Sequence, residues 1–211
     1  IGKGTIESPI TLDLNGFDIT GANSERGNTT SAKSGIIKLS ASHVLLTDTS
    51  LGDEKGAIIN TSTSTGATST VLVIDGSTLT IDGGLKIETK GSSSACALQT
   101  KEATVTVENA VIEGSGGYAI KQSSAEIGDL GPNEYVLTIN GGIFSSSDKD
   151  ANISVFSAPS SSRPNIVING GSFLNWLYYD NNKVVENRAV CITGPDVSGG
   201  FKVEVADAAP L

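Results

Sequence analysis

The chain has 211 residues, of which 25 are glycine, none is methionine and only 5% are aromatic. This composition excludes a core made of a few large side chains, whereas 37% hydrophobic residues suffice for a core of many small ones. The formal charge of −9 argues against nucleic acid and anionic lipid as partners, because a phosphate backbone would be repelled. No segment approaches eighteen consecutive apolar residues, so we expect no insertion into a membrane.

Similar strand-like segments recur about every thirty residues. Each contains two apolar residues separated by one polar or β-branched residue, followed by Asn, Asp or Glu and usually by Gly. In chain order they are ITLDLNGFDIT (10–20), SHVLLTDTSLG (42–52), STLTIDGGLKIE (77–88), ATVTVENAVIEG (103–114), YVLTINGGIFS (135–145) and NIVINGGSFLN (165–175). The alternation has period two, which predicts β-strands with Leu12 and Leu14, or Leu79 and Ile81, directed inward.

A shorter strand-like segment lies between successive copies. These segments are GIIKLS (35–40), GAIIN (56–60), ACALQT (95–100), YAIKQ (118–122), ISVFS (153–157) and AVCIT (189–193). VLVID (71–75) is an additional apolar run, and FKVEV (201–205) is a candidate for a further layer. Strands joined without helices do not suit a βαβ sheet, whose crossovers are usually helical. We therefore predict an all-β parallel solenoid that forms a single domain over residues 1–211, either complete or excised from a longer protein.

The step from Asn or Asp to Gly predicts a sharp corner after each long strand, since both residue types tolerate left-handed backbone conformations. We interpret Asn15, Asp82, Asn140 and Asn169 as a corner ladder whose side chains bond between layers, with Glu108 in the corresponding place of another copy. In the weaker copy at 42–52, either residue 47 or residue 48 takes this position. A residue type repeated at turns favours a structural role over a catalytic one.

These repeats resemble those of bacterial secreted and cell-surface proteins with the pectate-lyase-like fold. The segments ITLDLNGFDIT, LTIDGG, LTINGGIFS and VINGGSF carry the resemblance, which extends over residues 10–205. It implies a right-handed parallel β-helix, here with about six to seven irregular rungs, and an extracellular or cell-surface location. Its motifs concern the fold, and the fold does not settle function, because enzymes, adhesins and phage tailspikes share it.

The catalytic signatures of the enzymes in this family are missing from the sequence. Polygalacturonase-like hydrolysis uses paired carboxylates in NTD, DD and GHG motifs, and the lone His43 lies in ASHVLL instead. Pectate-lyase-like elimination needs a basic residue beside calcium, and Arg163–Pro164 is only a fragment of RxPxxR, because Ile168 replaces the second arginine. We assign no catalytic residue and expect a non-catalytic, adhesin-like or carbohydrate-binding module. Two alternatives stay open, a polysaccharide-active enzyme and a passive structural stalk.

One aromatic segment, FLNWLYYDNNK (173–183), is the candidate ligand site, and its ligand would be a polysaccharide or a host glycan. Flat aromatic faces beside amide and carboxylate groups suit sugars, since they combine stacking with hydrogen bonds to hydroxyl groups. The candidate residues are Trp176, Tyr178, Tyr179, Asp180 and Asn182. The competing interpretation is a loop that packs its aromatic side chains over the outside or the open end of the solenoid.

An acidic turn is the candidate metal site. Asp48, Asp53 and Glu54, in TDTSLGDEKG, could supply oxygen ligands to calcium, the one cofactor that the sequence suggests. The spacing of an EF-hand is lacking, so a solvated acidic turn without a metal is the competing interpretation.

Cys96 and Cys191 form no CxxC motif. The repeat places them in corresponding short strands three layers apart, and layers of 4.8 Å then separate them by roughly 14 Å, too far for a disulfide. We predict two buried free thiols.

Overall fold

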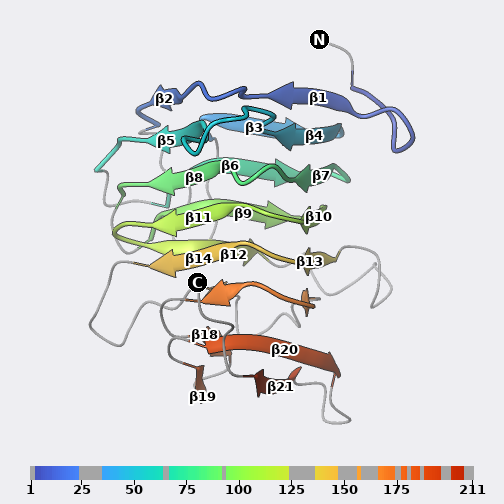
Figure 1. Cartoon of the computed structure of the whole chain (residues 1–211), viewed down its shortest axis with the longest axis vertical. Helices are drawn as coiled ribbons and strands as arrows, with labels where there is room; N and C mark the ends of the chain where they lie inside the picture. Colours follow the sequence, from blue (N-terminus) through green and yellow to red (C-terminus); the bar gives the residue numbers. More distant parts are fainter. Residues whose placement is uncertain are drawn as a thin grey trace.

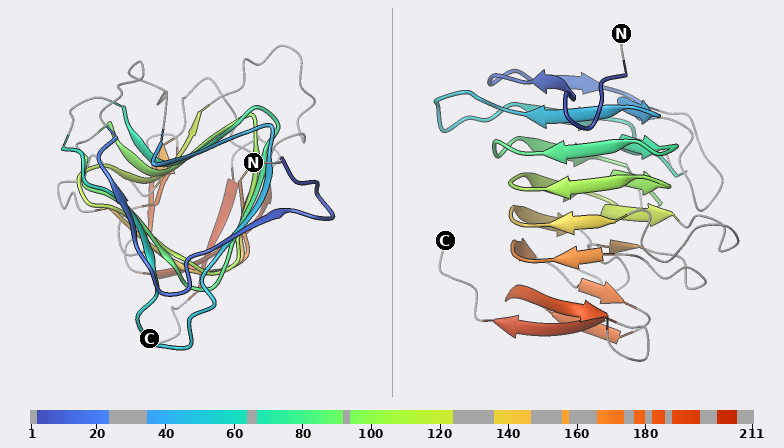
Figure 2. Two further views of the ribbon diagram at one scale, coloured as in Figure 1. Left: turned by 90° about the horizontal axis from the view of Figure 1, so that it is seen from above. Right: turned by 90° about the vertical axis from the view of Figure 1, so that its right-hand side faces the viewer.

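The computed structural model describes residues 3–23, 35–63, 67–91, 94–123, 136–146, 156–157, 166–173, 177–179, 182–185, 188–195 and 201–206. Within these residues the chain forms strands and no helix, and hence no helix that could cross a membrane. Strands stack along one long axis, and seen from above they enclose a triangle (Figures 1 and 2). The all-β prediction is confirmed, and the parallel strands in three stacked sheets are consistent with a β-solenoid.

Three sheets form the sides of this triangle, and we name them A, B and C. Sheet A contains β1 (Ile10–Asp13), β4 (His43–Thr47), β7 (Thr78–Ile81), β10 (Thr104–Val107), β13 (Leu137–Ile139) and β16 (Ile166–Ile168). Sheet B contains β2 (Ile19–Gly21), β5 (Ala57–Asn60), β8 (Lys86–Thr89), β11 (Val111–Gly114), β14 (Ile143–Ser146), β17 (Ser172–Phe173), β20 (Arg188–Pro195) and β21 (Phe201–Ala206). Sheet C contains β3 (Ile37–Ser40), β6 (Ser69–Ile74), β9 (Cys96–Lys101), β12 (Tyr118–Ser123) and β15 (Phe156–Ser157). In Figure 1, β1, β4, β7, β10 and β13 of sheet A lie on the right, and β2, β5, β8, β11 and β14 of sheet B lie on the left.

The chain therefore passes through three strands before it returns to the same sheet, where the sequence pattern suggested two. The segment GAIIN becomes β5 of sheet B and does not stack on GIIKLS, which contributes β3 of sheet C. The partner of β3 is β6, the run VLVID that the repeat left unassigned, with Ile37 opposite Val71. Sheets B and C both consist of short apolar strands, so composition alone did not separate them.

The core consists of columns of small aliphatic side chains in register. In sheet A, Leu46, Ile81, Val107 and Ile139 are successive Cα partners, and none is more than 1% exposed. In sheet B the corresponding column runs from Ile58 through Ile87 and Ile112 to Phe144, which is fully buried. Because every turn contributes the same few aliphatic residues, the glycine-rich and aromatic-poor composition is compatible with a continuous core.

The parallel order ends at the C-terminal end of the solenoid. Strand β20 pairs antiparallel with β17, and β21 pairs antiparallel with β20. FKVEV is therefore an antiparallel strand of sheet B, and its assignment to a further parallel layer is wrong. Cys191 lies in β20 of sheet B whereas Cys96 lies in β9 of sheet C, so the two cysteines do not occupy corresponding strands as predicted. The thiol of Cys96 is free and buried, and the side chain of Cys191 is outside the described residues.

Candidate functional site

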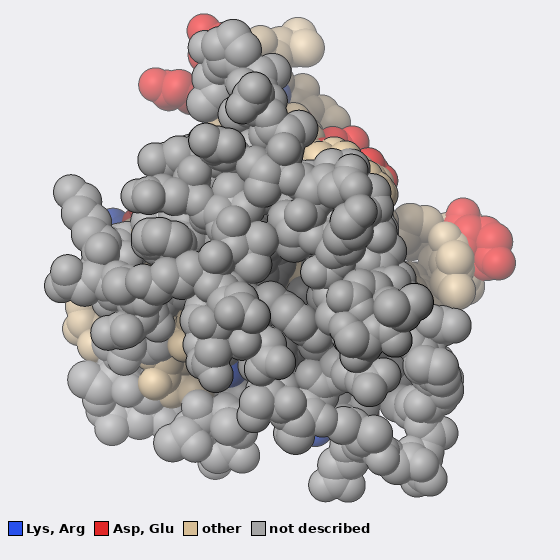
Figure 3. All heavy atoms as spheres, turned by 90° about the horizontal axis from the view of Figure 1, so that it is seen from below, with Lys and Arg blue, Asp and Glu red and all other residues tan. Residues whose placement is uncertain are grey.

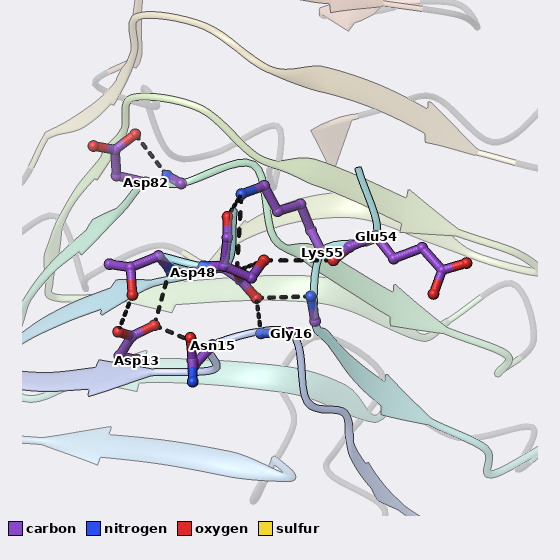
Figure 4. Close-up of polar contacts among 11 residues, drawn as sticks. Asp13, Asn15, Gly16, Asp48, Glu54, Lys55 and Asp82 are labelled. Carbon is purple, nitrogen blue, oxygen red and sulfur yellow. Dashed lines mark hydrogen bonds and ion pairs between the residues drawn. The ribbon is translucent and has the colours of Figure 1, made fainter. Parts of the chain in front are cut away.

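The most elaborate polar cluster in the described residues surrounds Asp48, directly after β4 (Figure 4). Its Oδ2 accepts the backbone N–H of Gly16 at 2.9 Å and that of Gly56 at 2.7 Å. Its Oδ1 accepts the backbone N–H of Ser50 at 2.9 Å and the Ser50 hydroxyl at 2.5 Å. The ammonium group of Lys55 lies 4.0 Å from Oδ1 and donates to the carbonyl oxygen of Ser50. We name these five residues the Asp48 corner.

The Asp48 corner holds a carboxylate that is ionised although its side chain has no exposed surface. Burial raises the pKa of Asp48, but the Ser50 hydroxyl and the three backbone N–H donors outweigh burial and hold the pKa well below its ordinary value. Gly56 is required here, because a Cβ atom would lie 2.8 Å from Oδ2 of Asp48 and 2.4 Å from the carbonyl oxygen of Phe17. The carboxylate thus ties the turn after β1 to the loop between β4 and β5.

The predicted calcium ligands do not converge at this corner. Both oxygens of Asp48 accept N–H or O–H donors and a lysine lies nearby, whereas calcium requires oxygen atoms directed at the ion. Asp53 and Glu54 are exposed. Among the described residues no group of three or more His, Cys, Asp or Glu side chains is arranged to hold a metal ion. This arrangement suits a structural role, in which the carboxylate joins two turns, and it does not suit a calcium site.

Exposed side chains form a ladder along the same edge of sheet A. The side-chain amide of Asn169 donates to Oδ1 of Asn140 at 2.8 Å, and the amide of Asn140 donates to Oε2 of Glu108 at 2.9 Å. Asp82 precedes them in the register and accepts the N–H of Gly83 at 2.7 Å. The predicted bonding between layers is thus found among Glu108, Asn140 and Asn169, which we name the ladder.

The first turn differs from the predicted ladder register. Thr47 is the Cα partner of Asp13, so Asp13 takes the position that we assigned to Asn15. The Asp13 carboxylate accepts the N–H of Thr49 at 3.0 Å, the Thr49 hydroxyl at 2.5 Å and the N–H of Asn15 at 2.9 Å. Asn15 has a φ of 46° and lies in the corner itself. These contacts, with the Thr49 hydroxyl the strongest, lower the pKa of Asp13.

The outward face of sheet A presents threonines in register. Thr80, Thr106 and Thr138 are successive Cα partners, and Thr78 opposes Thr104 in the adjacent column. All of them are half-buried, and the Thr78 hydroxyl lies 2.8 Å from Nδ1 of His43. The six strands of sheet A contain no Lys or Arg.

The outward face of sheet B carries a cluster of one base and two acids. The ammonium group of Lys86 lies 3.0 Å from Oε2 of Glu88 and 2.8 Å from Oε2 of Glu113. The Ser115 hydroxyl lies within 3.1 Å of Glu88 and 3.3 Å of Glu113. Partial burial opposes ionisation of Lys86 and Glu88, but the contacts with Glu113 and Glu88 raise the pKa of Lys86, and Lys86 lowers that of Glu88. The charges are mutually paired, as in a structural ion-pair network.

On the outward face of sheet C, β9 and β12 carry buried polar side chains, in contrast to sheet A. Gln99 and Lys121 are Cα partners and are only 1% and 6% exposed. Burial raises the pKa of the nearby Cys96 thiol to about 12. Burial likewise lowers the pKa of Lys121. A thiol that stays protonated is a poor nucleophile, so Cys96 packs as a small apolar side chain.

The predicted aromatic site lies in a separate hairpin, β18 (Leu177–Tyr179) and β19 (Asn182–Val185). Tyr178 and Tyr179 belong to β18, and Tyr179 is the Cα partner of Asn182. The backbone therefore brings Tyr179 and Asn182 together. Their side chains, and the whole of Trp176 and Asp180, lie outside the described residues.

No protein-family model, no curated protein and no solved structure matches the chain. The arrangement of the described side chains therefore carries the functional argument.

Proposed function

We propose that the chain is a non-catalytic, adhesin-like module of a secreted or cell-surface bacterial protein, and that it binds polysaccharide along the outward face of sheet A. In this proposal the fold is a right-handed parallel β-helix of the pectate-lyase-like type, with about six to seven rungs. The observation that supports it best is the repetition of the same polar groups in successive turns on this face.

The chemistry of this face suits sugars. The hydroxyl groups of Thr80, Thr106 and Thr138 can each donate and accept a hydrogen bond, as sugar hydroxyl groups do, and the threonine methyl groups offer apolar contact. Neighbouring strands lie about 4.8 Å apart, so a linear polymer lying across β7, β10 and β13 meets the same group at each of these strands. Individually weak contacts then add along the polymer.

The charges on and beside sheet A favour a neutral polysaccharide as the ligand. The strands of sheet A contain no cation that would pair with uronate or sulfate groups, and Asp82 and Glu108 are exposed at the edge of the face. In the view from below, described Asp and Glu side chains are visible at the periphery of the molecule (Figure 3). An anionic polymer would be repelled by this field.

A glycan array with matched variants tests the proposal. The double variant Thr80→Val and Thr106→Val removes two hydroxyl groups and keeps the shape and the strand propensity, so binding should fall at least about tenfold if each hydroxyl contributes an ordinary hydrogen bond. The control is Thr20→Val, on the exposed outward side of β2 in sheet B, which should leave binding unchanged.

Other outcomes contradict the proposal in distinguishable ways. Loss of binding in Trp176→Ala but not in the threonine variant would move the site to the aromatic segment 173–183, with Trp176, Tyr178, Tyr179, Asp180 and Asn182. Release of reducing sugar or unsaturated uronate from polysaccharides would show an enzyme. Neither binding nor turnover on any glycan would leave a passive stalk.

A further inference from the structure

The chain contains three Asn–Gly steps, and each lies at a corner that follows a strand of sheet A. They are Asn15–Gly16, Asn140–Gly141 and Asn169–Gly170. Glycine has no side chain to hinder its backbone nitrogen, so that nitrogen can approach the side-chain carbonyl carbon of the preceding asparagine. We propose that Asn169, and more slowly Asn140, are sites of spontaneous deamidation, and that the Asp48 corner protects Asn15.

The reaction needs only the chain and water. The backbone nitrogen of Gly170 loses its proton to solvent and attacks Cγ of Asn169, and a carbon–nitrogen bond forms. Nδ2 leaves Cγ as ammonia, which takes up a proton, and a succinimide ring remains. Water then adds to one of the two ring carbonyl groups and the corresponding ring carbon–nitrogen bond breaks. The product is aspartate or isoaspartate, and no oxidant or reductant takes part.

Asn15 is protected through the nitrogen of its neighbour. The N–H of Gly16 donates to Oδ2 of Asp48 at 2.9 Å, and that carboxylate is buried. An adjacent negative charge opposes removal of the proton from this N–H, and the hydrogen bond to the carboxylate must also be broken. Among the described residues no hydrogen bond holds the N–H of Gly141 or Gly170 in this way.

The hydrogen bonds of the ladder predict that Asn169 deamidates faster than Asn140. Asn140 is held at both ends of its amide, since it donates to Glu108 and accepts from Asn169. Asn169 is held by its donation to Asn140. To bring Cγ to the glycine nitrogen, Asn140 must give up two bonds and Asn169 one, and one ordinary hydrogen bond corresponds to a factor of about two to ten in rate.

Deamidation would break the ladder where it occurs. At position 169 a carboxylate would replace the amide that donates to Oδ1 of Asn140, and two acceptors would face each other. At position 140 a carboxylate would face Oε2 of Glu108 across 2.9 Å. An isoaspartate would in addition lengthen the backbone within a tight corner. Each event places one more negative charge at the edge of the outward face of sheet A.

The test is a time course of peptide mapping by mass spectrometry on the full chain, incubated folded in mildly alkaline buffer, with a urea-unfolded sample as reference. In the unfolded sample we expect the three sites to react at similar rates, because their local sequences are alike. In the folded protein Asn169 should react about tenfold or more faster than Asn15, since charge-assisted hydrogen bonds are the stronger ones, with Asn140 between them.

The variant Asp48→Asn tests whether the charge of Asp48 protects Asn15. In Asp48→Asn the charge next to Gly16 is lost, so the rate at Asn15 should rise several-fold while that at Asn169 stays the same. Asn169→Gln keeps an amide but would need a larger ring, so it should abolish reaction at position 169 alone. If Asn15 reacts first, or if all three sites react equally in the folded protein, the inference is wrong. Circular dichroism reports whether Asp48→Asn is folded, and if it is not, the ratio of rates in the unchanged protein decides.

Discussion

The Asp48 corner and the ladder lie along the same edge of sheet A, but the Asp48 carboxylate is buried whereas the side chains of the ladder are exposed. After β7 the chain crosses to β8 through residues 82–85, and the carboxylate of Asp82 stays exposed. After β4 the chain crosses to β5 through residues 48–56, and the carboxylate of Asp48 is completely buried. Both corners begin with an acidic residue within one position of the strand end.

The difference shows that the length of the connection decides the environment of a corner, and the residue type does not. A short connection leaves no backbone to cover the side chain, so Glu108, Asn140 and Asn169 bond to one another in solvent. The longer connection folds back and directs the N–H groups of Ser50 and Gly56 at one carboxylate. A buried carboxylate with several donors is costly to disturb, whereas an exposed ladder contributes little at each step.

Asp48→Ala is expected to have the largest effect. It leaves the buried N–H of Gly56 and the N–H groups of Gly16 and Ser50 without their acceptor, so the free energy of unfolding should fall by about 3 kcal/mol or more. Urea denaturation measures this loss. The matched variant Asp82→Ala removes an exposed carboxylate from the neighbouring turn and should cost less than about 1 kcal/mol. Equal losses would remove the distinction between the two corners.

Acid should weaken the Asp48 corner. The pKa of Asp48 is lowered below its ordinary value of 3.8, so near that value the unfolded chain binds more protons than the folded one. The stabilisation is complete above this range and is lost as the pH falls through it toward the folded pKa. We expect the difference in urea midpoint between the protein and Asp48→Asn to shrink below about pH 4. A difference independent of pH would contradict this, and because Asp13 and Glu88 also have lowered pKa values, only the difference is diagnostic.

Removing the middle of the ladder should have a moderate effect. Asn140→Ala abolishes the bonds to both Glu108 and Asn169, and the expected loss is about 1 kcal/mol, or a few degrees in melting temperature. Asn169→Ala abolishes one bond and should cost about half as much. Thermal unfolding followed by circular dichroism measures both. A larger loss for Asn169→Ala would mean that the bonds of the ladder do not act one by one.

Glu108→Gln should have the smallest effect. The glutamine side chain keeps an oxygen that accepts from Asn140, and Glu108 is exposed, so we expect less than about 0.5 kcal/mol. Urea denaturation at low and high salt measures the change and its screening. A loss above about 1 kcal/mol that salt reduces would show that the charge of Glu108 matters, and the ladder would then resemble the Asp48 corner.

The sequence predicted the class of the fold because period-two alternation survives in every copy. It misplaced the ladder in the first turn because ITLDL has three alternating apolar residues, and Ile10 and Leu12, not Leu12 and Leu14, are in the strand. Leu14 is nonetheless 5% exposed, so burial alone would not have corrected the register.

The site was less predictable than the fold. Burial of Asp48 depends on its contacts with Gly16 and Gly56, which form only when the chain has folded. No local sequence pattern predicts these contacts. The ion pairs of Lys86 could have been predicted from the sequence. Lys86 and Glu88 point to the same side of a strand, and Glu113 occupies the same position as Glu88 in the next copy. Aligning the copies by strand position would have brought these three charges together.

The long connection between β4 and β5 also has a practical consequence. It protrudes from the corner without altering the pairing of β4 with β7 or of β5 with β8. Its tip, around Leu51 and Asp53, is exposed, and the Asp48 corner fastens both of its ends. The entropic cost of closing a loop grows only slowly with the length of the loop. A foreign peptide inserted at this tip would therefore be displayed on the surface with both of its ends attached to the rigid solenoid.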